Sequence, residues 1–321
     1  MSNVHVVIVT YGDRLNLIEA TLAHLLDQPA ITAIHIVSNN ADYTLPQHSK
    51  IDPILLDTNT GSATGYKTGI ERAAAQSPDF IWLLDDDNRP SRDGLDHLLT
   101  QYSELQSTSP SHSQHIALTA SRQGRNIVSG HHQPDSSFLG FRLSDLPAKM
   151  IRRKREKPIS IENPVEITEL AHCPYGGLFF KPALLDIIGL PDESFVLYAD
   201  DIDFTGRIPE RGGKLYLVPQ ATIDDLSDSW NIASQDKSNL TLWLTTPGDM
   251  RAFYSARNLA FLEERQAGNS VSFRANRFAY VLLLAAYAIA FRKLPRLRIL
   301  LAAFKDARKG HLGLNHHYPL G

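Results

Sequence analysis

The chain has 321 residues, of which 43% are hydrophobic and 21% are charged. This composition is typical of a globular protein with a sizeable core, and it excludes the disordered and low-complexity classes. A single cysteine, Cys173, excludes a disulfide scaffold and a zinc site built from cysteines. The chain opens with MSNVHVVIVT, in which no basic segment precedes the apolar stretch, so these residues predict a strand and not a secretory signal. We therefore expect a cytoplasmic protein.

The net charge of −3 conceals an uneven distribution. Residues 271–321 contain nine Lys or Arg and one acid, Asp306, which gives this segment a charge of +8 and leaves −11 for the rest of the chain. A basic segment on an acidic body favours contact with a polyanion, either nucleic acid or an anionic membrane surface. The basic segment contains no recognisable nucleic-acid-binding module, so we predict no nucleic-acid partner.

The first hundred residues alternate short apolar runs with apolar residues at helical spacing, the pattern of βα units around a parallel sheet. Asp13 is placed to cap the first helix. Strands are predicted over 4–10, 33–40, 53–58 and 80–87. Helices are predicted over 15–26, 66–75 and 94–105.

Regular patterning weakens over about 106–160, where we expect loops and edge structure. It returns with an apolar run, a helix and a strand at 176–180, 182–188 and 214–219, and the pattern beyond Asp225 is helical. The chain is therefore predicted to be an α/β protein. Its domain over 1–225 has a Rossmann-like, mostly parallel sheet flanked by helices, and a helical region follows over 226–321.

Polar residues gather where the predicted strands end, which is where open parallel sheets bind ligands. They are Thr10, Tyr11, Asp13, Asn39, Asn40, Asn59, Gly61, Asp85, Asp86 and Asp87. The three adjacent aspartates repel one another, so a cation is their natural compensation, and carboxylate oxygens suit Mg²⁺ or Mn²⁺ holding a diphosphate. Alternation along the strand predicts Asp85 and Asp87 on one side and Asp86 on the other. The alternative is a solvated acidic turn.

A second acidic cluster contains Asp200, Asp201 and Asp203. Asp203 is predicted in the first turn of a helix, where its charge favours the helix N-terminus. Asp200 and Asp201 are predicted on the loop before that helix, where a carboxylate can act as general base on an acceptor hydroxyl. A cation cluster with a separate carboxylate is what displacement at a sugar carbon requires, because the cation neutralises the leaving diphosphate.

An ordered set of segments over most of residues 4–262 resembles bacterial family 2 glycosyltransferases with the GT-A fold. Within that family it is similar to the branch of rhamnosyl- and galactofuranosyltransferases. The segments are VIVTYGDR, IVSNNA, TNTGSATGYKTGI, WLLDDDNRP, YGGLFFKPALLDIIGLPDESFVLYADDIDFTGR, KLYLVPQATIDD and FYSARNLAFL. The resemblance makes 1–225 a catalytic domain that binds a nucleotide-sugar donor and an acceptor.

The resemblance also implies a role for each matching residue. Asp85 and Asp87 would bind the metal, with Asp85 and Asp86 near the ribose. The nucleotide base and ribose would be held by Thr10, Tyr11, Asp13 and Asn40, and the loop containing Asn59 and Gly65 would flank the donor. Asp201 would be the general base and Asp200 an acceptor contact, in an inverting single displacement. Gly176 and Gly177 allow close approach of a sugar, or they mark a kink in a strand.

One position departs from the family pattern. Many relatives have a histidine that completes the metal site a few residues after the strand matching KLYLVP, and this chain has Asp224 and Asp225 in that stretch. Asp225 can replace the histidine as an oxygen ligand and would favour Mg²⁺ or Mn²⁺. Alternatively, the third ligand is missing and substrate holds most of the metal.

An apolar run of 14 residues over 278–291 lies between basic residues on both sides. The run is shorter than the roughly 20 residues of a spanning helix. Basic flanks with aromatic residues fit a helix lying in the membrane interface, attached to the inner face of the cell membrane, and the alternative is an ordinary core helix.

The sequence therefore predicts a metal-dependent glycosyltransferase of cell-surface polysaccharide assembly. Its favoured donors are UDP-galactofuranose and dTDP-rhamnose, and its acceptor is a hydroxyl of a glycan or polyprenyl-linked glycan. A sugar nucleotidyltransferase would need a Gly-rich basic loop after the first strand, and an NAD enzyme would need a G-x-G-x-x-G there. The remaining alternative is a non-catalytic sugar-nucleotide-binding or scaffold protein, suggested by the missing histidine.

Overall fold

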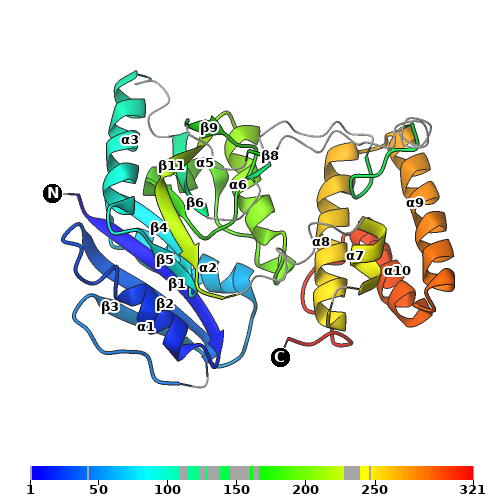
Figure 1. Ribbon diagram of the computed structural model, residues 1–321, viewed down its shortest axis with the longest axis horizontal. Coiled ribbons are helices and arrows are strands. Elements are labelled where there is room, and N and C mark those ends of the chain that lie inside the picture. Colours follow the sequence, from blue (N-terminus) through cyan, green and yellow to red (C-terminus); the bar gives the residue numbers. More distant parts are fainter. Residues whose placement is uncertain are drawn as a thin grey trace. The chain divides into compact units, whose positions relative to one another are not determined.

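A computed structural model describes residues 2–41, 43–108, 115–122, 127–128, 137–144, 160–161, 166–227, 239–245 and 247–320. The chain forms two compact units, which are described separately (Figure 1). The described residues of the first unit are 2–41, 43–108, 115–122, 127–128, 160–161, 166–193 and 200–227. Those of the second unit are 137–144, 194–199, 239–245 and 247–320.

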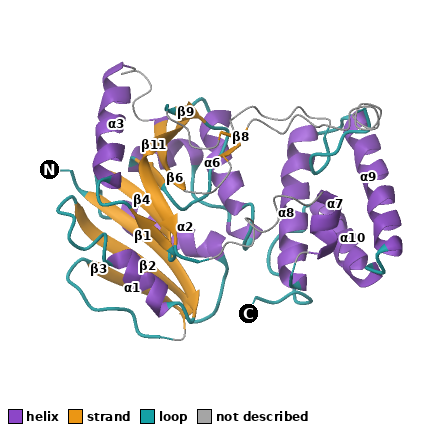
Figure 2. Ribbon diagram, in the orientation of Figure 1, coloured by secondary structure: helices purple, strands orange, loops and turns teal. Residues whose placement is uncertain are grey.

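The first unit is built on a mixed sheet of nine strands within the described residues (Figure 2). In spatial order, the strands are β3 (Ile51–Leu56), β2 (Ile31–Ala41), β1 (Val4–Gly12), β4 (Phe80–Asp85), β10 (Leu178–Phe180), β6 (Ile116–Arg122), β11 (Lys214–Asp225) and β5 (Asn88–Pro90), with β9 (Thr168–Glu169) also paired to β11. Strands β3, β2, β1 and β4 run parallel, and β10 is antiparallel to both of its neighbours. A separate antiparallel ribbon joins β7 (Ile127–Val128) and β8 (Ser160–Ile161).

Helices cover both faces of this sheet because its central strands are apolar on both sides. Helices α1 (Leu15–Leu22) and α3 (Gly94–Thr108) pack in the cluster that contains Val6 and Ile8 of β1. The opposite cluster, around Val7, contains residues of α2, α5 and α6. Their bounds are Ser62–Ala74, Leu185–Ile188 and Asp200–Glu210, with 3₁₀ turns at Pro182–Leu184 and Glu193–Phe195. The predicted α/β domain with a mostly parallel sheet is confirmed.

Some local predictions are wrong. Asp13 makes no helix cap, because α1 begins after Arg14 and has no side-chain cap. Residues 116–122 form the central strand β6 and not edge structure, because the strand pairs with β10 and β11 on its two sides and its apolar side chains are buried. Asp200 and Asp201 lie in the first turn of α6 and not on a preceding loop. Asp203 also lies in that first turn, as predicted.

Gly65 lies inside α2 and not in the loop that was predicted to flank the donor. A Cβ on Gly65 would come within 2.6 Å of Val9 Cγ1. The glycine therefore lets α2 pack closely on β1. A larger residue at this position would clash with Val9.

The second unit is helical in its described part. Its helices are α7 (Asn239–Thr245), α8 (Asp249–Ala267), α9 (Val271–Ala290) and α10 (Leu294–Lys309). They enclose a core of their own that includes Phe253, Tyr280 and Phe304, so the helical expectation beyond Asp225 is confirmed for these residues. No helix in the described part of the chain combines the length and the apolar content needed to cross a bilayer.

Two buried histidines form a polar ladder across β1, β2 and β3. His35 Nδ1 lies 2.9 Å from Asp52 Oδ2, and His35 Nε2 lies 3.0 Å from His5 Nδ1. Burial lowers the pKa of His5 to about 4, and it also lowers the pKa of His35. The fold therefore accommodates these rings in their neutral form.

We predict that acidification destabilises the protein through this ladder. The unfolded chain protonates His5 near pH 6.5, whereas the folded chain resists protonation until about pH 4, so stability is full above pH 6.5 and falls below it. Urea unfolding should show a loss of roughly 1 to 2 kcal/mol between pH 7 and pH 5, reduced in His5→Gln. The exposed His316→Gln is the control, and an unchanged pH profile in His5→Gln would contradict the prediction.

Candidate functional site

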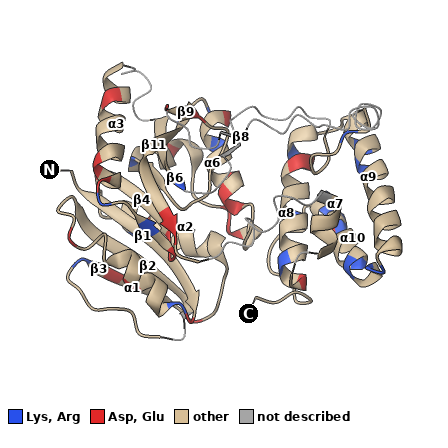
Figure 3. Ribbon diagram, in the orientation of Figure 1, with Lys and Arg blue, Asp and Glu red and all other residues tan. Residues whose placement is uncertain are grey.

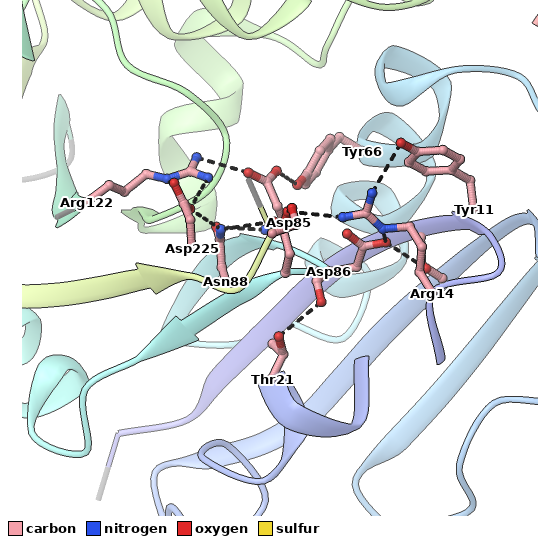
Figure 4. A network of polar contacts seen from close by, with 12 residues as sticks. Tyr11, Arg14, Thr21, Tyr66, Asp85, Asp86, Asn88, Arg122 and Asp225 are labelled. Atoms are coloured by element: carbon pink, nitrogen blue, oxygen red, sulfur yellow. Dashed lines mark hydrogen bonds and ion pairs between the residues drawn. The ribbon is translucent and has the colours of Figure 1, made fainter. Parts of the chain in front are cut away.

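The carboxyl ends of β1 and β4 meet β5, β6 and β11 at one polar edge of the first unit (Figure 4). Asp85 is the last residue of β4, and Asp86 and Asp87 follow in the turn before β5. The strand therefore ends one residue into the aspartate run. The strand-alternation argument therefore does not extend to Asp86 and Asp87, which lie in the turn.

Arg122 at the end of β6 binds two carboxylates from different strands. Its Nη1 donates to Asp85 Oδ2 at 3.0 Å, and its Nη2 lies 2.5 Å from Asp225 Oδ1 (Figure 4). Burial lowers the pKa of the guanidinium, but the nearby charges of Asp85 and Asp225 outweigh this effect and raise the pKa of Arg122. Asn88, paired with Asp225 in the β5–β11 ladder, donates to the same carboxylate at 3.0 Å.

Arg14, just after β1, binds the other two aspartates. Its Nε lies 2.8 Å from Asp86 Oδ2, and its Nη2 lies 3.0 Å from Asp87 Oδ2. Asp86 is buried and also accepts a hydrogen bond from the Thr10 hydroxyl at 2.8 Å. Burial raises the pKa of Asp86 to about 7, although Arg14 and Thr10 act in the opposite direction. This carboxyl can therefore gain or lose a proton near neutral pH.

Gly176 and Gly177 form the backbone wall beside this network. A Cβ on Gly176 would come within 2.6 Å of Asp85 Oδ2 and 2.8 Å of Arg122 Nη1. Gly177 has a φ of +106°, a conformation that L side chains rarely adopt, and its N–H donates to the Leu83 carbonyl at 2.8 Å. Close approach of backbone to the polar cluster and a turn entering β10 thus both require glycine here.

Asp200 and Asp201 begin α6. Asp200 is buried, and its Oδ2 accepts a hydrogen bond from Ser62 at the start of α2, at 2.8 Å. Asp201 is partly exposed, and its Oδ1 accepts from the Ile202 N–H. Burial raises the pKa of both carboxyls, and the negative charge of Asp85 adds to the rise. Asp201 is thus a carboxyl of raised basicity beside the strand-end cluster.

The residues directly before α6 have an unusual backbone. Val196, Tyr198 and Ala199 all have positive φ, between 60° and 67°, a region that costs energy for side chains of this kind. Asn258 of α8 holds the segment by donating to the carbonyls of Leu197 and Tyr198, each at 2.8 Å. These contacts fix the chain immediately before Asp200.

The remaining predicted donor residues lie at or just after the carboxyl ends of β1, β2 and β3. Tyr11 is about half exposed, and its ring lies under the Arg14 guanidinium, 5.1 Å from centroid to Cζ. Asp13 and Asn40 are exposed, and Asn59 accepts from the Gly61 N–H at 3.1 Å. Asn40 also lines a cavity of about 640 Å³ at the β2–β3 edge. Their roles in binding stay predictions.

The predicted metal ligands Asp85, Asp87 and Asp225 do not form an ion site in this structure. Among the described residues, no three His, Cys, Asp or Glu side chains are placed to hold a metal ion. Carboxylate oxygens suit Mg²⁺ or Mn²⁺, but here those of Asp85 and Asp225 face Arg122 and those of Asp87 face Arg14 and Ser227. As arranged, this donor set does not fit a metal, because its oxygens are bound to guanidinium groups and do not converge on one point.

Several residues of the site were not found from the sequence. Arg14 and Asn88 lie within the segments TYGDR and DDDNRP, so their neighbours were a signal for them. Tyr66, whose hydroxyl donates to Asp85 Oδ1 at 2.8 Å, lies four residues inside a helix. Arg122 lies in a stretch with no motif, and only the tertiary fold brings it to the aspartates.

Comparison with known proteins finds a similarity in the N-terminal part of the chain. Residues 5–154 match the family model described as Glycosyl transferase family 2. The first part of the chain is therefore similar to glycosyltransferase family 2 over a little under half of the chain's length. No curated protein sequence matches the chain.

Two solved structures are similar to the chain at low sequence identity, and GalNAc-T7, with a TM-score above 0.5, supports the fold. The first is GalNAc-T7 with UDP, GalNAc and Mn²⁺, at 12% identity and a TM-score of 0.51, covering 87% of this chain and 54% of that one. The second is residues 1–349 of S. aureus TarS, at 12% identity and a TM-score of 0.46, covering 96% of this chain and 92% of that one. This chain thus spans about half the length of the GalNAc-T7 chain. The domain has the GT-A fold, as its sequence predicted.

We predict that Arg122 is essential for the stability of the polar edge. Arg122→Met leaves Asp85 and Asp225 as uncompensated charges, so urea unfolding at pH 7 should show a loss of about 3 to 5 kcal/mol. The matched control is Arg89→Met, which breaks the exposed Arg89–Asp224 pair between β5 and β11 and should cost below about 1 kcal/mol. Equal losses in the two variants would contradict the prediction.

Proposed function

We propose that the protein is an inverting glycosyltransferase that moves a sugar from a nucleotide-diphosphate donor to a hydroxyl of its acceptor. The observation that carries this proposal is Asp201, a carboxyl of raised pKa beside the acidic strand ends of a domain similar to glycosyltransferase family 2. A general base is most effective when its pKa lies near the working pH. The raised pKa of Asp201 therefore suits proton transfer better than that of an ordinary surface aspartate.

The reaction is a single displacement. The acceptor hydroxyl oxygen forms a bond to the anomeric carbon of the donor sugar, while the bond from that carbon to the diphosphate oxygen breaks. Asp201 takes the hydroxyl proton, and the diphosphate leaves with the bonding electrons. Attack opposite the leaving group inverts the anomeric carbon. Asp200, hydrogen-bonded to Ser62, and the bare backbone of Gly176 and Gly177 would contact the acceptor.

The donor side of the proposal uses the residues after β1, β2 and β3. Thr10, Tyr11, Asp13 and Asn40 would hold the base and ribose, with Asn59 beside them and Asp85 and Asp86 closing the ribose side. The cavity that Asn40 lines offers apolar and polar groups together, as nucleotide pockets do. We propose UDP-galactofuranose or dTDP-rhamnose as the donor, on the resemblance described above.

The negative charge of the strand-end cluster opposes binding of the donor's diphosphate. Four carboxylates, Asp85, Asp86, Asp87 and Asp225, face two guanidinium groups at this edge, so the cluster remains negative before a diphosphate arrives. Like charges this close repel. We therefore keep Mg²⁺ or Mn²⁺ in the proposal as a co-ligand of the nucleotide, and we assign it no step of the reaction.

We place the reaction in cell-surface polysaccharide assembly, with a glycan or polyprenyl-linked glycan as acceptor. Transfer to a lipid-linked acceptor would occur at the inner face of the cell membrane. The second candidate is a sugar-nucleotide-binding or scaffold protein without activity. The observation in its favour is that arginines bind the carboxylates that would hold a metal in an active relative.

We predict that Asp201→Asn abolishes transfer and leaves nucleotide binding nearly unchanged. The amide cannot accept the hydroxyl proton, so kcat should fall by about 10²-fold or more, the usual contribution of a general base. Turnover is measured with radiolabelled donor, and nucleotide binding by calorimetry. The control is Glu210→Gln at the exposed far end of α6. Near wild-type turnover of Asp201→Asn would exclude this residue as the base.

We predict that one of UDP and dTDP binds only with a divalent ion present. Calorimetric titration of each nucleotide with Mn²⁺, with Mg²⁺ and with chelator would measure this. Asp87→Ala should weaken the ion-dependent binding, because it removes one carboxylate from the negative edge. Binding of equal strength in chelator would remove the ion from the proposal. Binding without any transfer or donor hydrolysis would support the scaffold protein instead.

A further inference from the structure

Helix α9 buries one face and exposes an apolar stripe on the other. Phe273, Asn276, Tyr280, Leu284 and Ala288 are its buried residues, spaced along one side. The opposite side carries Val271, Ala275, Phe278, Leu282, Ala286 and Ile289, all exposed and separated by three or four positions. Residues at this spacing share one face of a helix. Phe278 is 67% exposed and Ile289 is 65% exposed, so large side chains stand in water along the helix.

The apolar stripe continues into the turn between α9 and α10. Phe291 is 61% exposed, and Leu294, at the start of α10, is also exposed. Between them lie Arg292, which has a φ of +55°, and Lys293, both exposed. An apolar patch of this extent on a globular protein marks an interaction site.

The sequence segment that contains the stripe carries charges of one sign, although Arg277 and Arg296 pair with Glu264 and Asp249 of α8. From Arg265 to Lys305, the chain contains eight Lys or Arg residues and no Asp or Glu. Figure 3 shows the basic residues at the turn that joins α9 and α10. Arg274 lies in the first turns of α9, and Arg298 lies exposed on α10. The surface defined by the stripe and the turn therefore offers apolar side chains with cations at both ends.

We propose that this face of α9, with the α9–α10 turn, binds an anionic lipid surface. The apolar side chains would enter the boundary between headgroups and acyl chains, with the helix lying parallel to the membrane. Arg274, Arg292, Lys293 and Arg298 would contact the anionic headgroups, to which each cation adds about fivefold in binding. No helix in the described residues can span the bilayer, and lying in the interface does not require one to do so.

Charge selects this partner over a second copy of the chain. Two copies joined through α9 would bring cations against cations in either helix direction, since neither helix has an acid to pair with them. Glu264, the nearest acid before the helix, is already paired with Arg277 at 2.7 Å. An anionic bilayer supplies the missing opposite charge together with an apolar phase. This inference does not depend on the transfer reaction.

Vesicle sedimentation with the full chain tests the proposal. Wild-type protein should bind vesicles that contain phosphatidylglycerol at low salt, and it should bind at least about tenfold more weakly to vesicles of phosphatidylcholine alone or in high salt. Phe278→Glu/Leu282→Glu should lose binding to the anionic vesicles by at least about tenfold. Arg292→Gln/Lys293→Gln should lose more than about tenfold at low salt and show a weaker dependence on salt.

The matched control is Leu55→Glu/Leu314→Glu, which makes the same charge change at two exposed leucines outside the stripe and should bind like the wild type. Circular dichroism would establish that each variant is folded, as expected for substitutions at exposed positions. Absence of wild-type binding to anionic vesicles at low salt would overturn the proposal. So would equal binding by the Phe278→Glu/Leu282→Glu variant.

Analytical ultracentrifugation tests whether a second copy of the chain, and not a lipid surface, binds this face. The wild type should sediment as one species over a wide range of concentration. Concentration-dependent dimers that disappear in Phe278→Glu/Leu282→Glu, with no vesicle binding, would assign the face to a second copy and overturn the lipid proposal. Failure of nucleotide binding or transfer would leave the vesicle result unaffected, so the two proposals can fail separately.

Discussion

The polar edge of the sheet depends on two guanidinium groups that partly neutralise its carboxylates. Asp85, Asp86 and Asp87 are adjacent in the chain, and Asp225 reaches the same edge from β11, so charges of one sign meet in a partly buried place. Uncompensated, they would cost several kcal/mol and would shift toward their protonated forms. Arg122 ties β4 to β11, and Arg14 ties the segment after β1 to the turn after β4. The strand ends can therefore converge only with these two side chains present.

The same two arginines shape the chemistry of the edge. They hold the carboxylates in fixed positions, and Arg14 limits the rise that burial causes in the pKa of Asp86, which is about 7. Asp201 lies in the first turn of α6, where burial also raises the pKa of its carboxyl. Carboxyls in one region but with different environments can take different roles, one group binding and another transferring a proton. If all these carboxylates were solvated, their environments would be alike and their pKa values would not differ in this way.

The second unit combines a conventional core with an unsatisfied face. Helix α8 carries Arg257 and Asn258 inward, where they bind carbonyls of the segment before α6, while α9 turns one face outward with large apolar side chains. The prediction of a core helix over 278–291 is confirmed for the buried side of α9. The prediction that this helix lies in the membrane interface stays a proposal for its exposed side. A single run of apolar residues thus contains both a packing surface and a candidate docking surface.

The sequence by itself determined the α/β alternation, the order of most elements and the strand-end clustering of polar residues, because these follow from local periodicity and from the geometry of parallel sheets. Through the resemblance, it also singled out Asp201 as a general base, which stays a prediction. Only the tertiary structure decided which charges meet: Arg122 and Asp225 are 103 positions apart and pair because β6 and β11 are neighbours. Strand β6 itself was missed, since its burial comes from strands distant in the chain. Contacts of this kind depend on strand order, which local patterns do not encode.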